Sequence, residues 1–198
     1  MIKKRMGREE KQHITREKLF EAALELMVSK GFHAASVSDI AETAGFSKGA
    51  FFSNFSSKAD LLLCLAQRFK GAEIERLSAT VNASESAEAL EHGLSLYIDS
   101  LKHNKACVII DVELQLLAAR DTTFAPHYHA LHKQHSEALG VLIERIFNQA
   151  GKQVPLERSM LARVFTSLVE GLILQCHEDP AQEIKLVWSA LMQSAPAL

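Results

Sequence analysis

The sequence of 198 residues contains few of the residues that interrupt regular secondary structure, with nine glycines and four prolines. This scarcity favours helices over a fold rich in loops. Hydrophobic residues make up 47% of the chain, which is enough for a sizeable core in one compact unit or in two small units packed together. We therefore expect an all-α protein of about nine helices, without strands or internal repeats.

Long apolar runs and paired cysteines are also missing. No segment reaches the roughly 18 uninterrupted apolar residues of a membrane-spanning helix, and the basic start MIKKRMGREEKQ lacks the apolar core of a secretory signal. Cys64, Cys107 and Cys176 are odd in number and show no CxxC spacing, so free thiols in a reducing compartment are the simplest interpretation. These absences predict a cytoplasmic protein with no membrane partner.

Charge of neither sign dominates, because the net charge is −2. The charge is nevertheless uneven. Residues 1–58 carry ten Lys/Arg against seven Asp/Glu, a balance of +3, and the remainder carries twelve against seventeen, a balance of −5. A basic head on an acidic body is typical of a protein that touches nucleic acid at one end. The excess is small, so this interpretation also needs a motif.

The segment 36–60, SVSDIAETAGFSKGAFFSNFSSKAD, supplies that motif. Ser36 with Asp39 three residues later predicts a capped helix start. Gly45 predicts the end of this helix because glycine readily takes a positive φ, and Ser47 predicts the cap of a second short helix. Two short helices around a tight turn are typical of a helix-turn-helix that enters the DNA major groove.

This segment resembles the DNA-binding region of the TetR family of bacterial transcriptional regulators, and with the preceding helix the resemblance covers roughly the first third of the chain. Phe52 stands where the family usually has tyrosine, and Asn54 where it often has histidine or tyrosine. Phenylalanine cannot donate a hydrogen bond to a phosphate, whereas asparagine can. The matching stretches are SVSDIA (36–41), AGFSKG (44–49), FSNF (52–55) and SKADLL (57–62).

The resemblance implies two domains: a three-helix DNA-binding head over residues 1–56, and a helical effector-binding and dimerisation domain over residues 57–198. It implies a homodimer that represses transcription from a double-stranded DNA operator until a small-molecule effector releases it. Two alternatives share this fold: an activator, and a DNA-binding protein that responds to no ligand.

Within the head, the second short helix begins Lys48-Gly49-Ala50, whose short or basic side chains leave a smooth outward face. Lys58 begins a later helix, where the helix dipole disfavours a cation, so we expect it to meet a phosphate unless it is simply solvated. The predicted DNA-binding residues are Ser36, Ser47, Lys48, Gly49, Ala50, Phe52, Asn54 and Lys58.

Upstream, apolar spacing predicts a helix from Thr15 to Lys30, with Thr15 as its cap and Gly31 as its end. Residues 1–12 are expected to form a disordered basic arm. Such an arm either lies along DNA or is an unstructured start.

In the body we expect a mostly apolar cavity with a few polar groups, the usual form of a small-molecule site. Asp111 and Glu113 interrupt an apolar helix over 106–120, and a buried charge is costly without a partner. They therefore either meet a ligand or pair with Arg120 or His103. The predicted effector-binding residues are Phe69, Tyr97, Ile98, Glu113, Leu116, Leu117 and Tyr128.

The last two predicted helices carry apolar residues at helical spacing. The resemblance implies that these helices form a four-helix bundle with a second subunit. The alternative is that the same residues only fill the core of one subunit. The predicted interface residues are Leu161, Phe165, Leu168, Leu172, Trp188 and Leu191.

A histidine cluster is the only raw material for catalysis: His127, His129, His132 and His135, the last three of which can share a helix face. With Asp111 or Glu113 they could ligate zinc or nickel, although a solvated histidine face is the usual interpretation. The sequence has no Ser-His-Asp spacing, phosphate-binding glycine loop or metalloprotease signature. We therefore expect no catalytic residue, no metal and no cofactor, and keep an all-helical metal-dependent enzyme only as the rival hypothesis.

Overall fold

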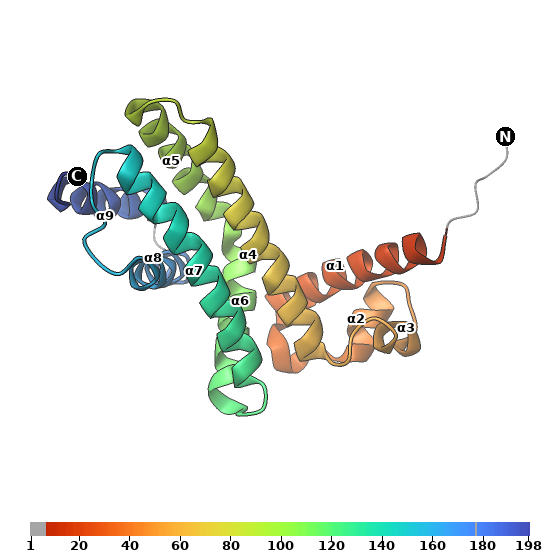
Figure 1. Cartoon of the computed structure of the whole chain (residues 1–198). Helices are drawn as coiled ribbons and strands as arrows, with labels where there is room; N and C mark the ends of the chain where they lie inside the picture. Colours follow the sequence, from red (N-terminus) through yellow and green to blue (C-terminus); the bar gives the residue numbers. More distant parts are fainter. Residues whose placement is uncertain (1–6, 177) are drawn as a thin grey trace, which may run out of the picture.

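A computed structural model describes residues 7–176 and 178–198, and these residues form nine α-helices and one short 3-10 helix (Figure 1). The all-α prediction with about nine helices is confirmed. The helices are α1 (Arg8–Ala34), α2 (Val37–Thr43), α3 (Lys48–Phe52), α4 (Lys58–Ala83), α5 (Ala87–Leu101), the 3-10 helix η1 (Lys102–Asn104), α6 (Lys105–Arg120), α7 (Ala125–Gln149), α8 (Arg158–Leu174) and α9 (Pro180–Ser194).

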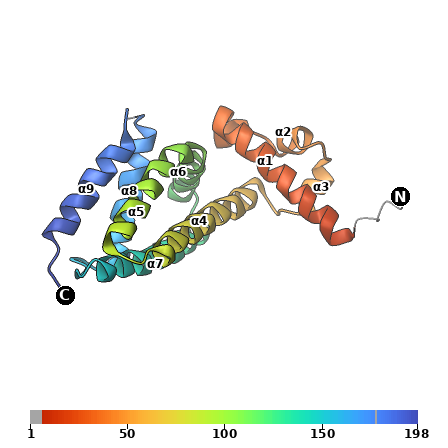
Figure 2. The ribbon, with the colours of Figure 1, turned by 90° about the horizontal axis from the view of Figure 1, so that it is seen from above.

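The helices form a small head and a larger body. The head consists of α1, α2 and α3, and the long helix α4 runs from it into the body (Figure 2). There α4 packs against α5, α6 and α7, and α8 and α9 lie on the side of the body away from α4. α7 packs against both α4 and α8, and α1 packs against α6. Within the described residues, no helix combines the length and the apolar character that crossing a membrane requires.

α1 begins earlier than its sequence predicts. Its cap is Gly7, and Thr15 lies in its interior, where the hydroxyl donates to the Lys11 carbonyl at 2.9 Å. Glu9 and Glu10 occupy the first turn, where the helix dipole favours acidic side chains. The predicted start at Thr15 is therefore wrong, and the last part of the predicted arm is helical. Residues 1–6 of that arm lie outside the described residues.

The local signals of the helix-turn-helix are confirmed. The Ser36 hydroxyl accepts from the Asp39 amide at 3.2 Å, and the Asp39 carboxylate accepts from the Ser36 amide at 2.9 Å, which completes a capping box. Gly45 has φ 77° at the turn, and the Ser47 hydroxyl caps α3 by accepting from the Ala50 amide. These contacts fix where α3 begins.

The head and the near end of the body share one apolar core. Buried side chains of α1, α2 and α3 pack with those of α4, α6 and α7 in a single cluster. A second cluster joins α4, α5, α7 and α8, and a third joins α5, α8 and α9. The head is therefore packed against the body and is not tethered by a loop alone. Representative members of the shared core are Leu19, Ile40, Phe51, Leu61, Ile110, Leu114 and Leu131.

Candidate DNA-binding face and effector cavity

α3 is anchored on one side and open on the other. Phe51 is 0% exposed and Phe55 is 2% exposed, and their ring centroids lie 5.8 Å apart. The Arg16 guanidinium lies 4.4 Å from the centre of the Phe55 ring and donates to the Asn54 carbonyl at 2.8 Å. α1 therefore holds the end of α3. The opposite side of α3 exposes Lys48 and Gly49 to solvent together with the capping residue Ser47.

The remaining predicted DNA-binding residues differ in placement. Ser36 is exposed, Phe52 is 56% exposed and Ala50 is half-buried. Asn54 is half-buried, and its side-chain amide donates to the Ala50 carbonyl at 2.8 Å. Its side-chain oxygen is buried and has no hydrogen-bond partner within the described part of the chain.

Lys58 turns toward the head and away from solvent. Its ammonium donates to the carbonyls of Phe32 and of Ala35, the latter at 2.7 Å, and lies 4.2 Å from the centre of the Phe32 ring. Burial lowers the pKa of this ammonium, although the nearby Glu113 and Asp39 oppose the shift. Lys58 therefore satisfies carbonyls at the end of α1, and the predicted phosphate contact gains no support from this position. The signal in the sequence was the end of α1, whose carbonyls need donors.

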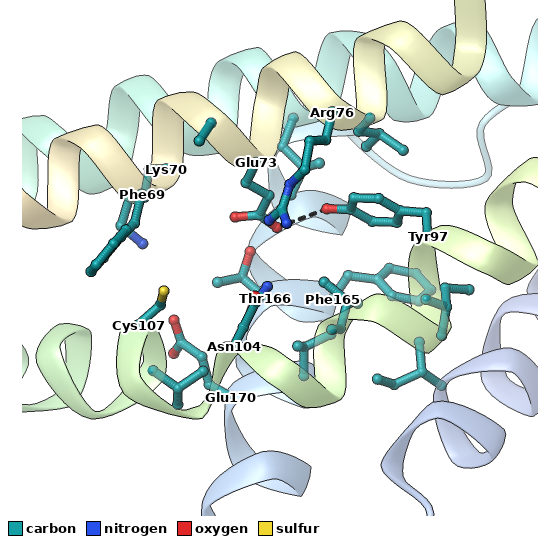
Figure 3. A pocket seen from close by; sticks show the side chains of 18 of the residues that line it. Phe69, Lys70, Glu73, Arg76, Tyr97, Asn104, Cys107, Phe165, Thr166 and Glu170 are labelled. Carbon is teal, nitrogen blue, oxygen red and sulfur yellow. Dashed lines mark hydrogen bonds between the residues drawn. The ribbon is translucent and has the colours of Figure 1, made fainter. Parts of the chain in front are cut away.

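The body encloses a cavity of about 360 Å³ between α4, α5, α6, α7, α8 and α9 (Figure 3). Its walls are mostly aliphatic and aromatic, and several charged side chains reach it from α4, α6 and α8. The apolar lining includes Phe69, Leu77, Ile98, Val108, Phe165 and Trp188, and the charged lining consists of Lys70, Glu73, Arg76, Asp111 and Glu170.

One end of the cavity holds a buried ion pair. The Lys70 ammonium lies 3.2 Å from the Asp111 carboxylate, which also accepts from the Tyr128 hydroxyl at 3.2 Å. The Gln115 side chain donates to Asp111 at 3.4 Å and to Glu170 at 3.1 Å. The partner of Asp111 is thus Lys70, and neither Arg120 nor His103, which the sequence suggested.

The two neighbouring carboxyl groups, Asp111 of the ion pair and Glu170, have pKa values shifted in opposite directions. Burial opposes ionisation of Asp111, but the Lys70 ammonium keeps the pKa of Asp111 below its usual value. Burial, followed by the nearby Asp111 carboxylate, raises the pKa of Glu170 to about 8. At neutral pH the cavity therefore contains a protonated Glu170 beside an ionised Asp111.

A second cluster of polar side chains lies around Glu73, farther along α4. The Glu73 carboxylate receives a hydrogen bond from the Tyr97 hydroxyl at 3.1 Å (Figure 3). It also lies 3.1 Å from Nε2 of His135. Burial opposes ionisation of Glu73, but the bond with His135 lowers its pKa overall. Arg76 points into the same part of the cavity, near Glu73 and Tyr97 (Figure 3).

The structure brings Phe69, Tyr97 and Ile98 to the cavity, as predicted. The other four predicted effector-binding residues do not line it. Glu113 accepts from the Phe32 amide at 3.1 Å, where α6 meets the head, and Leu116 is 44% exposed. Leu117 packs against the core shared with the head, and Tyr128 is buried where it supports Asp111.

The histidine cluster is divided between the interior and the surface. His135 is buried against Glu73, and His132 is half-buried, with its ring centroid 5.8 Å from that of Tyr128. His127 and His129 are exposed. Over residues 7–176 and 178–198, no three His, Cys, Asp or Glu side chains are grouped so that they could hold a metal ion.

The predicted interface residues of α8 and α9 face the interior of the subunit. Leu161 and Leu172 are buried, and the rings of Phe165 and Trp188 lie 5.3 Å apart between helices. Leu168 and Leu191 pack against buried clusters. These positions agree with the alternative interpretation, core filling. A separate set on the same two helices is exposed: Met160, Val164, Leu174, Leu186 and Val187.

Comparison with known proteins agrees with the geometry of the head. The model of the family described as bacterial regulatory proteins, tetR family, matches residues 19–65, which include α2, α3 and the beginning of α4. Residues 19–65 thus match the DNA-binding domain of the TetR family. This family model describes bacterial regulatory proteins, and the match covers the helices of the head that surround the turn at Gly45.

The relatives that match this chain are aligned over part of their length. The transcriptional activator FasR of Mycolicibacterium smegmatis is 31% identical over 90 residues, which are 45% of this chain and 41% of FasR. The fatty acid metabolism regulator protein of Bacillus subtilis is 31% identical over 100 residues, 49% of this chain and 51% of that protein. The alignments thus span about half the length of these relatives or less.

The whole TetR-family fold is shared with solved structures. The fatty acid degradation regulator FadR from Bacillus halodurans superposes with a TM-score of 0.73 over 96% of this chain and 98% of that chain, at 19% identity. At this identity the likeness establishes the fold of both head and body.

Proposed function

We propose that the chain is a dimeric repressor that binds a near-palindromic DNA operator with its head and leaves it when a small molecule fills the body cavity. The head corresponds to residues 1–56 and the effector-binding and dimerisation domain to residues 57–198. The observation that carries this proposal is the juxtaposition of an open α3 face with an apolar, charge-lined cavity on helices that contact the head.

The proposed DNA-binding face combines small side chains with a cation. Ser47, Lys48 and Gly49 are exposed, so neither bulky side chains nor the rest of the head covers this part of α3. Lysine contacts with phosphates or guanine edges fit this placement. Lys58 is left out because it is bonded to α1. The face comprises Ser36, Ser47, Lys48, Gly49, Ala50, Phe52 and Asn54.

Coupling between cavity and head would act through the end of α1. Glu113 of α6 accepts from the Phe32 amide, and Lys58 of α4 donates to the Phe32 and Ala35 carbonyls. Both helices also line the cavity. A ligand that changes the spacing of α4 and α6 would therefore move α1 and the attached α3. Operator affinity would fall because two heads could no longer engage two half-sites together.

The effector is proposed to be an acyl-chain compound. The long apolar walls of the cavity suit such a chain, and two similar proteins are named for fatty acid metabolism and fatty acid degradation. An activator with the same binding face is the second candidate, because FasR is named an activator. Either regulator would act in the cytoplasm, where its DNA lies.

Dimerisation is proposed to use the exposed apolar side of α8 and α9. On α8, Met160, Val164 and Leu174 fall on one side of the helix, and Leu186 and Val187 extend the apolar surface on α9. A two-fold dimer places two recognition helices about one DNA turn apart. These five residues replace the six that the sequence suggested.

The proposal is tested by selecting duplexes from a random DNA library with the full chain and measuring their affinity by fluorescence anisotropy. Saturated fatty acids of increasing length and their coenzyme A thioesters are then added. We expect a near-palindromic sequence to be selected and at least one acyl series to release it. If no sequence is enriched, the DNA-binding proposal is wrong. If DNA binds but no acyl compound releases it or raises the melting temperature, the effector class is wrong.

A further inference from the structure

The open side of α3 carries an aromatic ring that folding does not explain. Phe52 is 56% exposed, whereas the other exposed large apolar residues of the described head, Ile14 and Val28, are 37% and 41% exposed. Phe51 and Phe55 already anchor the helix from the inner side. Phe52 therefore contributes little to the core while exposing apolar surface to water, which is unfavourable unless a partner covers it.

We infer that Phe52 is a specificity-determining residue that packs against the 5-methyl group of a thymine in the operator. This inference rests on the proposed function. Lys48 and Phe52 are four residues apart and so lie on the same side of α3. The Phe52 ring meets that of Phe51 edge to face, with centroids 5.3 Å apart. Lys48 would bring the phosphates or guanine edges close, and Phe52 would then meet the neighbouring base.

The chemistry of the Phe52 side chain indicates which group of the DNA it contacts. A phenyl ring has no hydrogen-bonding atom, so it cannot hold a phosphate oxygen or read the polar edge of a base. In the major groove the thymine methyl is the apolar group that distinguishes one base pair from another. The deoxyribose is the other apolar surface of DNA, and contact with it would carry no sequence information.

Gly49 supplies a second, independent observation on the same surface. Glycine inside a helix costs about 1 kcal/mol relative to alanine. The fold does not require it, because an added Cβ would meet nothing nearer than the Ser47 hydroxyl at 3.6 Å, an ordinary contact, and no positive φ occurs there. A bare backbone beside Phe52 is explained by close approach of DNA, which lets the ring reach a base edge.

The test removes one thymine methyl group at a time from the DNA. In the duplex that the full chain selects, each thymine is changed in turn to deoxyuridine, which removes only the methyl group. At one thymine in each half-site we expect the change to weaken wild-type binding about fourfold. The Phe52→Ala variant is expected to bind the thymine and deoxyuridine duplexes with equal affinity at that position.

Two variants serve as controls. Val28→Ala shortens another exposed apolar residue of the head and should keep the full thymine preference. Phe52→Leu keeps an apolar side chain and should keep part of it. Circular dichroism and melting temperature establish that each variant is folded, which the exposure of Phe52 favours.

The possible outcomes separate this inference from the proposed function. If Phe52→Ala weakens the thymine and deoxyuridine duplexes equally, the ring contacts the sugar and the inference is wrong. If Phe52→Ala keeps the wild-type thymine preference, or no thymine shows one, the inference is also wrong although DNA binding stands. If the wild-type chain enriches no sequence, the proposed function is wrong, and the inference about Phe52 is then wrong as well.

Discussion

The head and the body use charged and polar side chains in opposite ways. In the head, the polar residues of α2 and α3 lie at the surface and fix helix starts, as the capping pair of Ser36 and Asp39 does. In the body, Lys70 and Asp111 are buried as an ion pair that supports no helix end. Polar side chains of the head thus shape the local backbone at the surface, whereas this ion pair joins two helices inside the body.

The two regions also differ in how they depend on distant parts of the chain. The capping hydrogen bonds that begin α2 and α3 join residues three positions apart. The polar end of the cavity joins α4, α6, α7 and α8, with Lys70 and Asp111 far apart in sequence. The starts of α2 and α3 are thus defined locally, whereas the cavity exists only once the body has folded.

The largest expected effect breaks the anchor of the head. Phe51→Ala removes a fully buried ring and should lower the free energy of unfolding by about 3–5 kcal/mol. Urea unfolding followed by circular dichroism measures the change. Phe52→Ala, one residue away but exposed, should stay within about 0.5 kcal/mol of the wild type. Similar losses for both variants would contradict the two-sided description of α3.

The corresponding change in the body breaks the buried ion pair. Lys70→Met leaves Asp111 buried without its cation and should cost about 3 kcal/mol. The double variant Lys70→Met/Asp111→Asn removes both charges and should recover part of this loss. Urea unfolding of the single variants Lys70→Met and Asp111→Asn and of the double variant measures the three losses. If the double variant is as unstable as the sum of the single changes, the two side chains do not act as a pair.

A smaller, pH-dependent effect comes from Glu170. In the folded chain the pKa of Glu170 is about 8, above the usual value of 4.5, so unfolding between these pH values releases a proton. The free energy of unfolding should therefore fall as pH rises through this window and level off above it. Glu170→Gln should remove this component of the decline. Urea titrations at a series of pH values measure the free energy of unfolding of both proteins. If the wild-type and Glu170→Gln curves run parallel across this window, Glu170 does not titrate in this way.

A still smaller effect on stability should appear at the joint between the regions. Glu113→Ala deprives the Phe32 amide of its acceptor and should cost about 1 kcal/mol. If the joint transmits effector binding, the same variant should bind its operator and yet be released less by the effector. Glu113→Gln keeps an acceptor and serves as the matched control. If the effector releases the Glu113→Ala variant from its operator as well as it releases the wild type, this contact does not transmit effector binding.

The head could be predicted from sequence because its signals are local. Ser36, Gly45 and Ser47 act on residues within a turn of themselves, and the two predicted caps and the predicted glycine turn are confirmed. Lys58 was misread because its partners, the Phe32 and Ala35 carbonyls, lie on another helix. The start of α1 was misplaced because Thr15 is a good cap by type but lies within a longer helix.

The sequence predicted that the body contains an apolar cavity, but it did not identify most of the residues that line it. α6 is apolar on several sides, and periodicity does not tell which side meets the head and which the cavity. Leu117 and Glu113 thus face the head, whereas Val108 and Asp111 line the cavity. Lys70 was missed because its pairing with Asp111 depends on how α4 packs against α6. The same ambiguity affected α8 and α9, whose most regular apolar positions fill the subunit core.

The central claim is that the open face of α3 binds DNA, and the salt dependence of operator affinity tests it most directly. Wild type, Lys48→Ala and Lys133→Ala are titrated with the selected duplex across a range of KCl concentrations. Lys48→Ala should weaken binding and reduce the slope of log affinity against log salt by about 1 per subunit. Lys133→Ala, which removes an exposed lysine of the body, should change neither. Unchanged affinity and slope for Lys48→Ala would contradict the account.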